Sequence, residues 1–155
     1  MADPASSAVL RAAVPSDVDG IARCARAAYT VYIERMGREP APMVADFKND
    51  VAVKDVVVAC HNNKLLGYVV FYPGGDSMQL ENIAVFPQYA GNGIGRKLIE
   101  HVEQTASALD MAYIELYTNE AMTENIAMYP ALGYREFDRR CEDGFNRVYF
   151  RKRPG

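Results

Sequence analysis

The sequence predicts a mixed α/β protein whose central sheet carries helices on both faces. Two observations lead to this prediction. Apolar, β-branched runs separated by short turn sequences recur between residues 56 and 85, which is typical of an antiparallel meander. Residues 78–99 then read as a strand, a glycine loop and a helix. The strand that follows this helix indicates a parallel crossover.

The expected elements follow in order along the chain. Residues 1–7 should form a loose tail. Helices are expected to end before Gly37 and Gly133, because glycine adopts the left-handed conformation that closes a helix. The predicted strands are 8–14, 56–60, 65–72, 77–85, 111–117, 134–140 and 145–152, and the predicted helices are 17–35, 44–49, 93–108 and 122–132.

Composition limits the class of protein. The chain has 155 residues, which suits one domain over 1–155, and its net charge of −3 argues against nucleic acid as the main partner. No apolar run approaches the ~20 residues that a membrane helix needs. The first residues have neither a basic start nor an apolar signal core. We therefore expect a cytoplasmic protein with no membrane or nucleic-acid partner.

Cysteine and histidine spacing predicts neither a disulfide frame nor a metal site. The three cysteines, Cys24, Cys60 and Cys141, are odd in number and far apart, as free thiols in a reducing compartment would be. The two histidines, His61 and His101, have no partner at the spacing of metal ligands. No metal cofactor is expected.

The glycine loop predicts an anion-binding site. Gly91, Gly93 and Gly95 lie where a strand ends and a helix begins, so the first N–H groups of that helix have no partner within it. Such groups bind phosphate readily. The spacing fits neither the dinucleotide fingerprint nor the P-loop. A turn in which glycine serves geometry alone is the alternative.

This loop resembles the coenzyme A loop of the GNAT superfamily of N-acetyltransferases, usually written [RQ]-x-x-G-x-[GA] after a strand ending V-x-P. The matching residues are Val85-Phe86-Pro87 and Gly93-Ile94-Gly95, whereas Ala90 stands where Arg or Gln is usual. A second GNAT segment, ending Y-x-x-x-G-[FY], is matched by Tyr129, Gly133 and Tyr134. Met122 stands where the family often has Asn.

The resemblance implies transfer of an acetyl group from acetyl-CoA to a primary amine of a small molecule or peptide, by direct attack. In such a site a backbone N–H near Ala84 or Val85 would bind the acetyl carbonyl, and Asn125 lies on the helical face of Tyr129. The residues expected to contact acetyl-CoA are Ile83, Ala84, Val85, Gly91, Asn92, Gly93, Ile94, Gly95, Arg96 and Asn125.

Two groups are expected to move protons. Glu81 is the expected general base, because it is a carboxylate in an otherwise apolar strand just before the carbonyl-binding backbone. Tyr129 matches the family tyrosine near the sulfur of coenzyme A and is the expected acid. The alternatives are a solvent-facing Glu81 and a Tyr129 that only packs, with its hydroxyl bonded locally.

The acceptor wall is expected on the first helix and the loop after it. Tyr29, Tyr32 and Arg35 would suit a small acceptor with an apolar body and a carboxylate. In the alternative, the tyrosines pack in the core and the arginines pair on the surface. The final hairpin has an edge through which a homodimer could form.

Two other functions stay open. One is a non-catalytic, acyl-CoA-binding GNAT-like module, which Ala90 and Met122 favour. The other is an unrelated nucleotide-binding α/β protein that uses the glycine loop for ATP or NAD.

Overall fold

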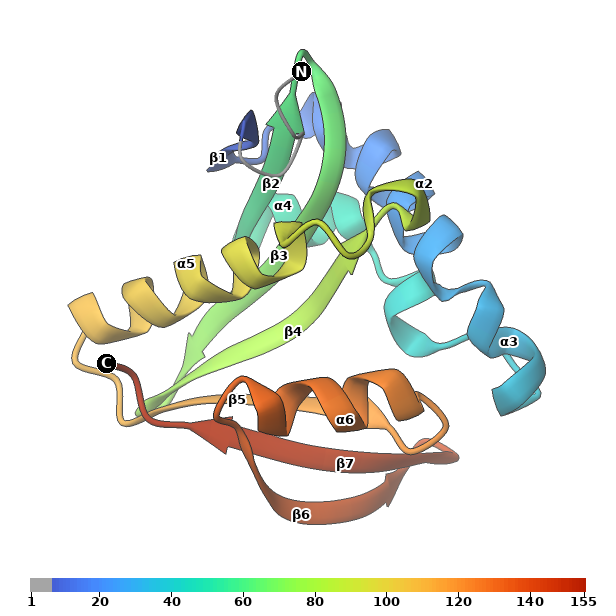
Figure 1. Cartoon of the computed structure of the whole chain (residues 1–155), viewed down its shortest axis with the longest axis vertical. Coiled ribbons are helices and arrows are strands. Elements are labelled where there is room, and N and C mark those ends of the chain that lie inside the picture. The colour runs from blue at the N-terminus through green and yellow to red at the C-terminus, as the bar shows by residue number, and fades with distance from the viewer. Residues whose placement is uncertain (1–6) are drawn as a thin grey trace. The chain divides into compact units, whose positions relative to one another are not determined.

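The computed structural model describes residues 7–155, so most of the predicted tail 1–7 lies outside the described residues. Seven strands form one sheet in the order β1-β2-β3-β4-β5-β7-β6 (Figure 1). The strands are β1 (Val9–Ala12), β2 (Asp55–His61), β3 (Lys64–Gly74), β4 (Ser77–Val85), β5 (Tyr113–Asn119), β6 (Arg135–Glu142) and β7 (Phe145–Lys152). The α-helices are α2 (Val18–Tyr29), α3 (Val31–Met36), α4 (Phe47–Val53), α5 (Ile94–Ala108) and α6 (Thr123–Ala131).

The predicted mixed sheet is confirmed. β2 pairs with β3 in antiparallel fashion, with Val57 opposite Val69. β4 and β5 pair in parallel, with Met78 opposite Ile114, and α5 connects them. The final hairpin also forms, since β6 and β7 are antiparallel. Within the described residues, no helix is both long and apolar enough to span a membrane.

The chain divides into two compact units. The first holds the described residues up to Tyr72 together with Glu81–His101, and the second holds Pro73–Leu80 together with Val102–Gly155. β4 and α5 each contribute to both units. The prediction of a single domain over 1–155 stays a prediction.

The first unit has helices on both sides of its strands. In Figure 1, α5 passes in front of β3 and α4 lies behind it. The apolar face of α2 is buried through Ile21, Cys24 and Ala25, and Phe47 of α4 packs edge-on against Tyr68 of β3 at 5.5 Å between ring centres. Burial of this apolar surface stabilises the strands that lead to the glycine loop.

The second unit packs α6 against the strands β5, β7 and β6 (Figure 1). Tyr129 of α6 lies against Phe150 of β7, with ring centres 5.9 Å apart, and against Tyr134, at 5.7 Å. Ile114 and Val148 complete this buried layer. The helix closes at Gly133, which has φ of 94°, as its position after the predicted helix required.

Two predicted helices need correction. The helix predicted over 17–35 is interrupted at Thr30, whose hydroxyl donates to the carbonyl of Arg26, and a threonine bound in this way disturbs a helix. The helix predicted over 44–49 starts later, because the Asp46 side chain accepts from the N–H of Asn49 at 3.1 Å and caps α4. The residues before it form a 3-10 turn, η2 (Ala41–Val44), which contains Pro42.

Candidate functional site

The glycine loop lies entirely in the first unit, between β4 and α5. A short 3-10 turn, η3 (Pro87–Tyr89), follows the strand, and Gly91 and Gly93 then take left-handed conformations with φ of 82° and 84°. A Cβ atom at either position would meet no atom within 4 Å. Glycine is therefore required there by backbone conformation, and the space above the loop is open.

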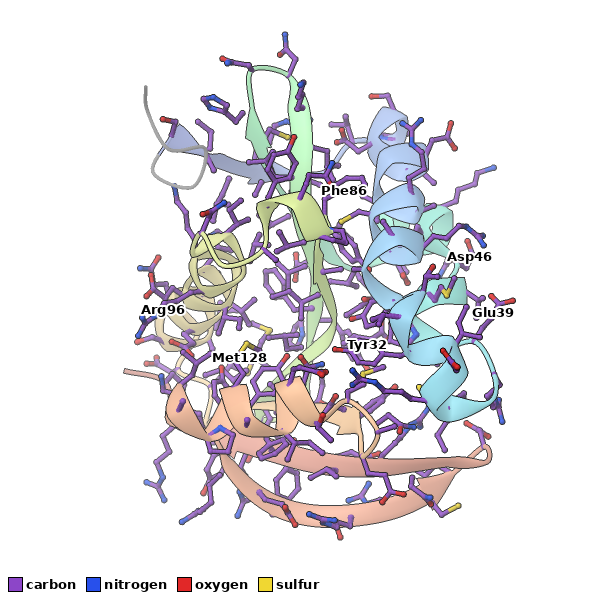
Figure 2. All side chains as sticks on the ribbon, turned by 45° about the vertical axis from the view of Figure 1, so that its right-hand side comes forward. Tyr32, Glu39, Asp46, Phe86, Arg96 and Met128 are labelled. Atoms are coloured by element: carbon purple, nitrogen blue, oxygen red, sulfur yellow. The ribbon has the colours of Figure 1, made fainter. Side chains whose placement is uncertain are left out.

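The start of α5 leaves backbone donors available. The N–H of Lys97 donates to the carbonyl of Gly93 at 3.0 Å, so the N–H groups of residues 94–96 come before the first helical hydrogen bond. The Arg96 side chain is 69% exposed and extends from the outer side of α5 in Figure 2. The positive end of the helix dipole and this cation both favour a bound anion.

The segment expected to bind the acetyl carbonyl is held on both sides. Gly67 of β3 lies so near β4 that an added Cβ would come within 2.7 Å of the carbonyl oxygen of Ala84. The Tyr29 hydroxyl donates to the carbonyl of Ile83 at 2.6 Å. The N–H of Phe86, labelled in Figure 2, donates to Leu66 at 2.9 Å. These contacts fix the backbone at the end of β4.

Asn82 is a buried polar residue, next to Glu81 in β4, that the sequence interpretation did not single out. Its side chain is buried, its amide oxygen accepts from the Tyr68 hydroxyl at 2.8 Å, and its amide nitrogen donates to the carbonyl of Pro42 at 3.1 Å. Asn82 therefore ties the turn η2 to β4. A signal was present, since an amide inside an apolar strand needs a partner when it is buried.

Glu81 is not a free surface carboxylate. Both of its oxygens accept from the ammonium of Lys54, at 2.7 and 2.9 Å, and the same ammonium lies 3.2 Å from Asp50. Burial lowers the pKa of Lys54, but the hydrogen bonds to Glu81 and Asp50 outweigh burial and raise that pKa above its usual value. No local sequence pattern indicates this cluster, because Asp50 lies on α4, Lys54 directly follows that helix and Glu81 lies on β4.

The residues expected to form the acceptor wall come from the end of α2 and from α3. Tyr29 is 7% exposed, and its hydroxyl is bonded to β4. Tyr32, labelled in Figure 2, lies 6.4 Å from the Tyr29 ring, and the Arg35 guanidinium lies over the Tyr32 ring at 5.1 Å. The structure brings the three side chains together. Their contact with an acceptor stays a prediction.

Tyr129 lies in the second unit. The residue is 4% exposed, and its hydroxyl makes no hydrogen bond to any residue that the structure describes. This differs from the alternative of a packing tyrosine with a locally bonded hydroxyl. Burial raises the pKa of Tyr129, so the hydroxyl keeps its proton near neutral pH and can act as a donor.

Asn125 lies one turn before Tyr129 on α6. Its amide nitrogen donates to the Thr118 hydroxyl at 3.3 Å, which connects the helix to β5. Thr118 in turn donates to the sulfur of Met122 at 3.4 Å. The amide of Asn125 thus has a structural partner within its own unit, and its contact with a cofactor stays a prediction.

The first unit carries most of the predicted site. It holds Glu81, the segment Ile83–Val85, the loop and helix start at 91–96, and the three acceptor-wall residues, whereas Asn125 and Tyr129 belong to the second unit.

Comparisons with known proteins agree on one family. The sequence profile described as the Acetyltransferase (GNAT) family matches residues 23–134. The "[Ribosomal protein bS18]-alanine N-acetyltransferase" of Escherichia coli (strain K12) is 32% identical over 75 residues, which cover 48% of this chain and 51% of that relative. The match therefore spans about half the length of this curated relative.

Solved structures show the same fold at low identity. The ribosomal-protein-S18-alanine N-acetyltransferase from Escherichia coli aligns with a TM-score of 0.75 and 19% identity, covering 95% of this chain and 94% of its own. The PaiA N-acetyltransferase from Thermoplasma acidophilum, in complex with coenzyme A, aligns with a TM-score of 0.79 and 15% identity, covering 95% and 99%.

Proposed function

The chain belongs to the GNAT family of acetyltransferases, and from this membership we propose that it transfers an acetyl group from acetyl-CoA to a primary amine of a small molecule or peptide. The observation that carries this proposal is the open loop with two left-handed glycines in front of α5, at the end of a strand whose backbone is firmly held. The residues fit acetyl-CoA, because they offer backbone donors and a cation where phosphates need them.

Acetyl-CoA supplies an activated thioester carbonyl when bound. The N–H groups of residues 91–96 would hold its pyrophosphate, and a backbone N–H of Ala84 or Val85 would stabilise the charge that develops on the carbonyl oxygen. One such preorganised donor is worth roughly 3 kcal/mol of barrier. Tyr29 and Gly67 support this step, because they fix the backbone between Ile83 and Ala84.

Glu81 and Tyr129 divide the proton transfers. Glu81 takes a proton from the acceptor amine, directly or through water, and Tyr129 gives one to the departing sulfur. A positioned acid or base contributes typically ~10²–10⁴-fold. The ion pair with Lys54 keeps the Glu81 carboxylate in one place, but an acceptor amine must share that carboxylate with Lys54.

For the acceptor we propose only a chemical class, a primary amine of a peptide or small molecule. The E. coli relative acts on an alanine of a ribosomal protein, by its name, which favours a peptide amine. The Arg35 and Tyr32 pair favours an acceptor with a carboxylate and an apolar part. Cytoplasmic localisation and pairing of two copies through β6, the last strand of the sheet, are further proposals.

Two measurements on one preparation test the function. We expect acetyl-CoA and coenzyme A, but not ATP or NAD, to raise Tm, since a ligand at 100 times its Kd adds about 2.7 kcal/mol to folding. We also expect thiol release from acetyl-CoA in the presence of an amine panel that includes peptides with N-terminal alanine. Binding without thiol release would support the non-catalytic module, and binding of ATP or NAD alone would contradict both readings.

A further inference from the structure

The amine of Lys54 lies against Glu81, where the acceptor amine of the proposed reaction would have to lie. Its Nζ atom lies 2.7 and 2.9 Å from the two oxygens of Glu81, the hydrogen-bond distance at which a general base meets the amine that it deprotonates. We infer that Lys54 is itself an acetyl acceptor, so that the protein modifies its own lysine with acetyl-CoA. This inference rests on the proposed function.

The backbone of Lys54 is anchored, and three neighbouring side chains set the resting place of its ammonium. It directly follows α4, its N–H donates to the carbonyl of Asp50 at 2.8 Å, and its ammonium contacts the Asp50 carboxylate at 3.2 Å. The ammonium also lies 5.2 Å from the centre of the Tyr72 ring. Two carboxylates and a ring thus surround a single amine, and the Lys54 side chain as a whole is 25% exposed.

The amine and the proposed acetyl site share one strand. Glu81 and Ala84 both belong to β4, and three residues of a strand span about 10 Å. In the inferred reaction Nζ leaves Glu81 after losing its proton, and the flexible four-carbon stem of the lysine lets it turn along β4 towards the thioester. Every residue involved lies in the first unit.

The chemistry balances without a further reactant. The ammonium of Lys54 loses one proton to Glu81, and the neutral Nζ attacks the thioester carbonyl carbon. The C–N bond forms, the C–S bond breaks, and the second Nζ proton is lost as the amide forms. One of the two protons ends on the coenzyme A thiol and the other in solvent, so the products are N-acetyl-lysine and free coenzyme A.

The chain offers an internal control. Lys48 lies on α4, the helix that Lys54 follows, and it is exposed to solvent. Uncatalysed acetylation by acetyl-CoA requires a neutral, accessible amine and should favour Lys48, because Lys54 is ion-paired and the carboxylates raise the pKa of Lys54. Preference for Lys54 over Lys48 would therefore indicate catalysis by the protein.

The experiment is peptide mass spectrometry after incubation with acetyl-CoA. We expect an acetyl group on Lys54 that forms at least ten times faster than on Lys48, is absent in Lys54→Arg, and forms at least ten times more slowly in Glu81→Gln. Lys48→Arg should leave the rate at Lys54 unchanged. Tm of each variant shows that it is folded.

The outcomes separate the inference from the function. Thiol release with external amines but no acetyl group on Lys54 would overturn the inference and leave the function standing. A rate at Lys54 that is unchanged in Glu81→Gln, or equal in heat-unfolded protein, would mean chemical acetylation and would also overturn it. Absence of coenzyme A binding, thiol release and modification together would refute the function, and the inference with it.

Discussion

At the scale of single residues, two tyrosines of the second unit differ in what their hydroxyl groups do. The Tyr134 hydroxyl donates to Glu103 at 2.8 Å, whereas the Tyr129 hydroxyl has no hydrogen-bond partner among the described residues. Their rings touch, at 5.7 Å between centres. The Tyr134 hydroxyl thus has a structural role, whereas the Tyr129 hydroxyl is available to transfer a proton.

Replacing Tyr129 by Phe should lower kcat by about 10²-fold, because the departing sulfur would lose its proton donor. Folding should be little affected, since removal of an unpartnered hydroxyl leaves no described group without its bond. Steady-state kinetics and thermal unfolding measure the two effects. The matched control is Tyr134→Phe, which should lose about 1 kcal/mol of stability with its hydrogen bond but keep kcat close to wild type. Equal kcat in both variants would contradict the role of Tyr129.

Replacing Glu81 by Gln should lower kcat/KM towards external amines by roughly 10²-fold or more, because an amide cannot take the amine proton. Glu136→Gln serves as control, because Glu136 is exposed on β6 and paired only with Arg139 among the described residues. An unchanged kcat/KM in Glu81→Gln would remove this residue from the mechanism.

At the scale of elements, the loop before α5 depends on glycine for its conformation. Gly93→Ala should weaken coenzyme A binding at least about tenfold, or 1.4 kcal/mol, because a left-handed alanine is strained and shifts the backbone donors. Isothermal titration gives the Kd. Gly75→Ala is the matched control, since Gly75 has φ of 68° and open space around it but lies in the turn between β3 and β4. The Gly75→Ala variant should lose about as much stability as Gly93→Ala but keep the wild-type Kd for coenzyme A.

The turn η2 depends on one buried amide. Asn82→Leu should destabilise the protein by about 1–3 kcal/mol, because the Tyr68 hydroxyl and the Pro42 carbonyl lose their partner. Unfolding in urea measures this change. KM for the acceptor should rise more than KM for acetyl-CoA if η2 borders the acceptor. Asn146→Ala is the control, because its bond to Glu120 is exposed, and it should stay within about 0.5 kcal/mol of wild type.

At the scale of the whole molecule, acid stability should depend on the ion pair between Arg11 of β1 and Asp17, the residue before α2. Hydrogen bonds from the Arg11 guanidinium lower the pKa of Asp17, although burial acts in the opposite direction. A lowered pKa stabilises the folded state above the unfolded value of about 4, and this stability is lost as the pH falls through the folded value.

The difference in Tm between wild type and Asp17→Asn should therefore be constant above about pH 5 and shrink below it. Thermal unfolding from pH 3 to pH 7 measures this difference. Asp19→Asn, on the first turn of α2, removes the same charge without touching the pair and should show no such trend. A constant difference at all pH values would show that Asp17 acts through something other than its charge.

The sequence by itself determined the order of elements and the glycine loop. The apolar patterns of strands and helices depend only on which side of each element is buried, so β2 to β5 could be predicted from the local sequence. Glycine favours a positive φ, so the conformation of Gly93 could be predicted in the same way. The prediction missed the break at Thr30 and the start of α4 after Asp46. Hydrogen bonds between these two side chains and the backbone determine where the helices end and begin.

Only the tertiary structure decided what the polar residues contact. The ion pair of Lys54 with Glu81 joins residues 27 positions apart, the bond of Tyr29 to Ile83 joins residues 54 apart, and Asn82 connects to Pro42 across 40. No local pattern encodes such a pairing, because a hydrogen bond forms wherever packing of the apolar faces brings donor and acceptor together. The glycines and the order of the strands thus indicate the cofactor from sequence alone. Only the folded chain shows that the amine next to Glu81 is that of Lys54.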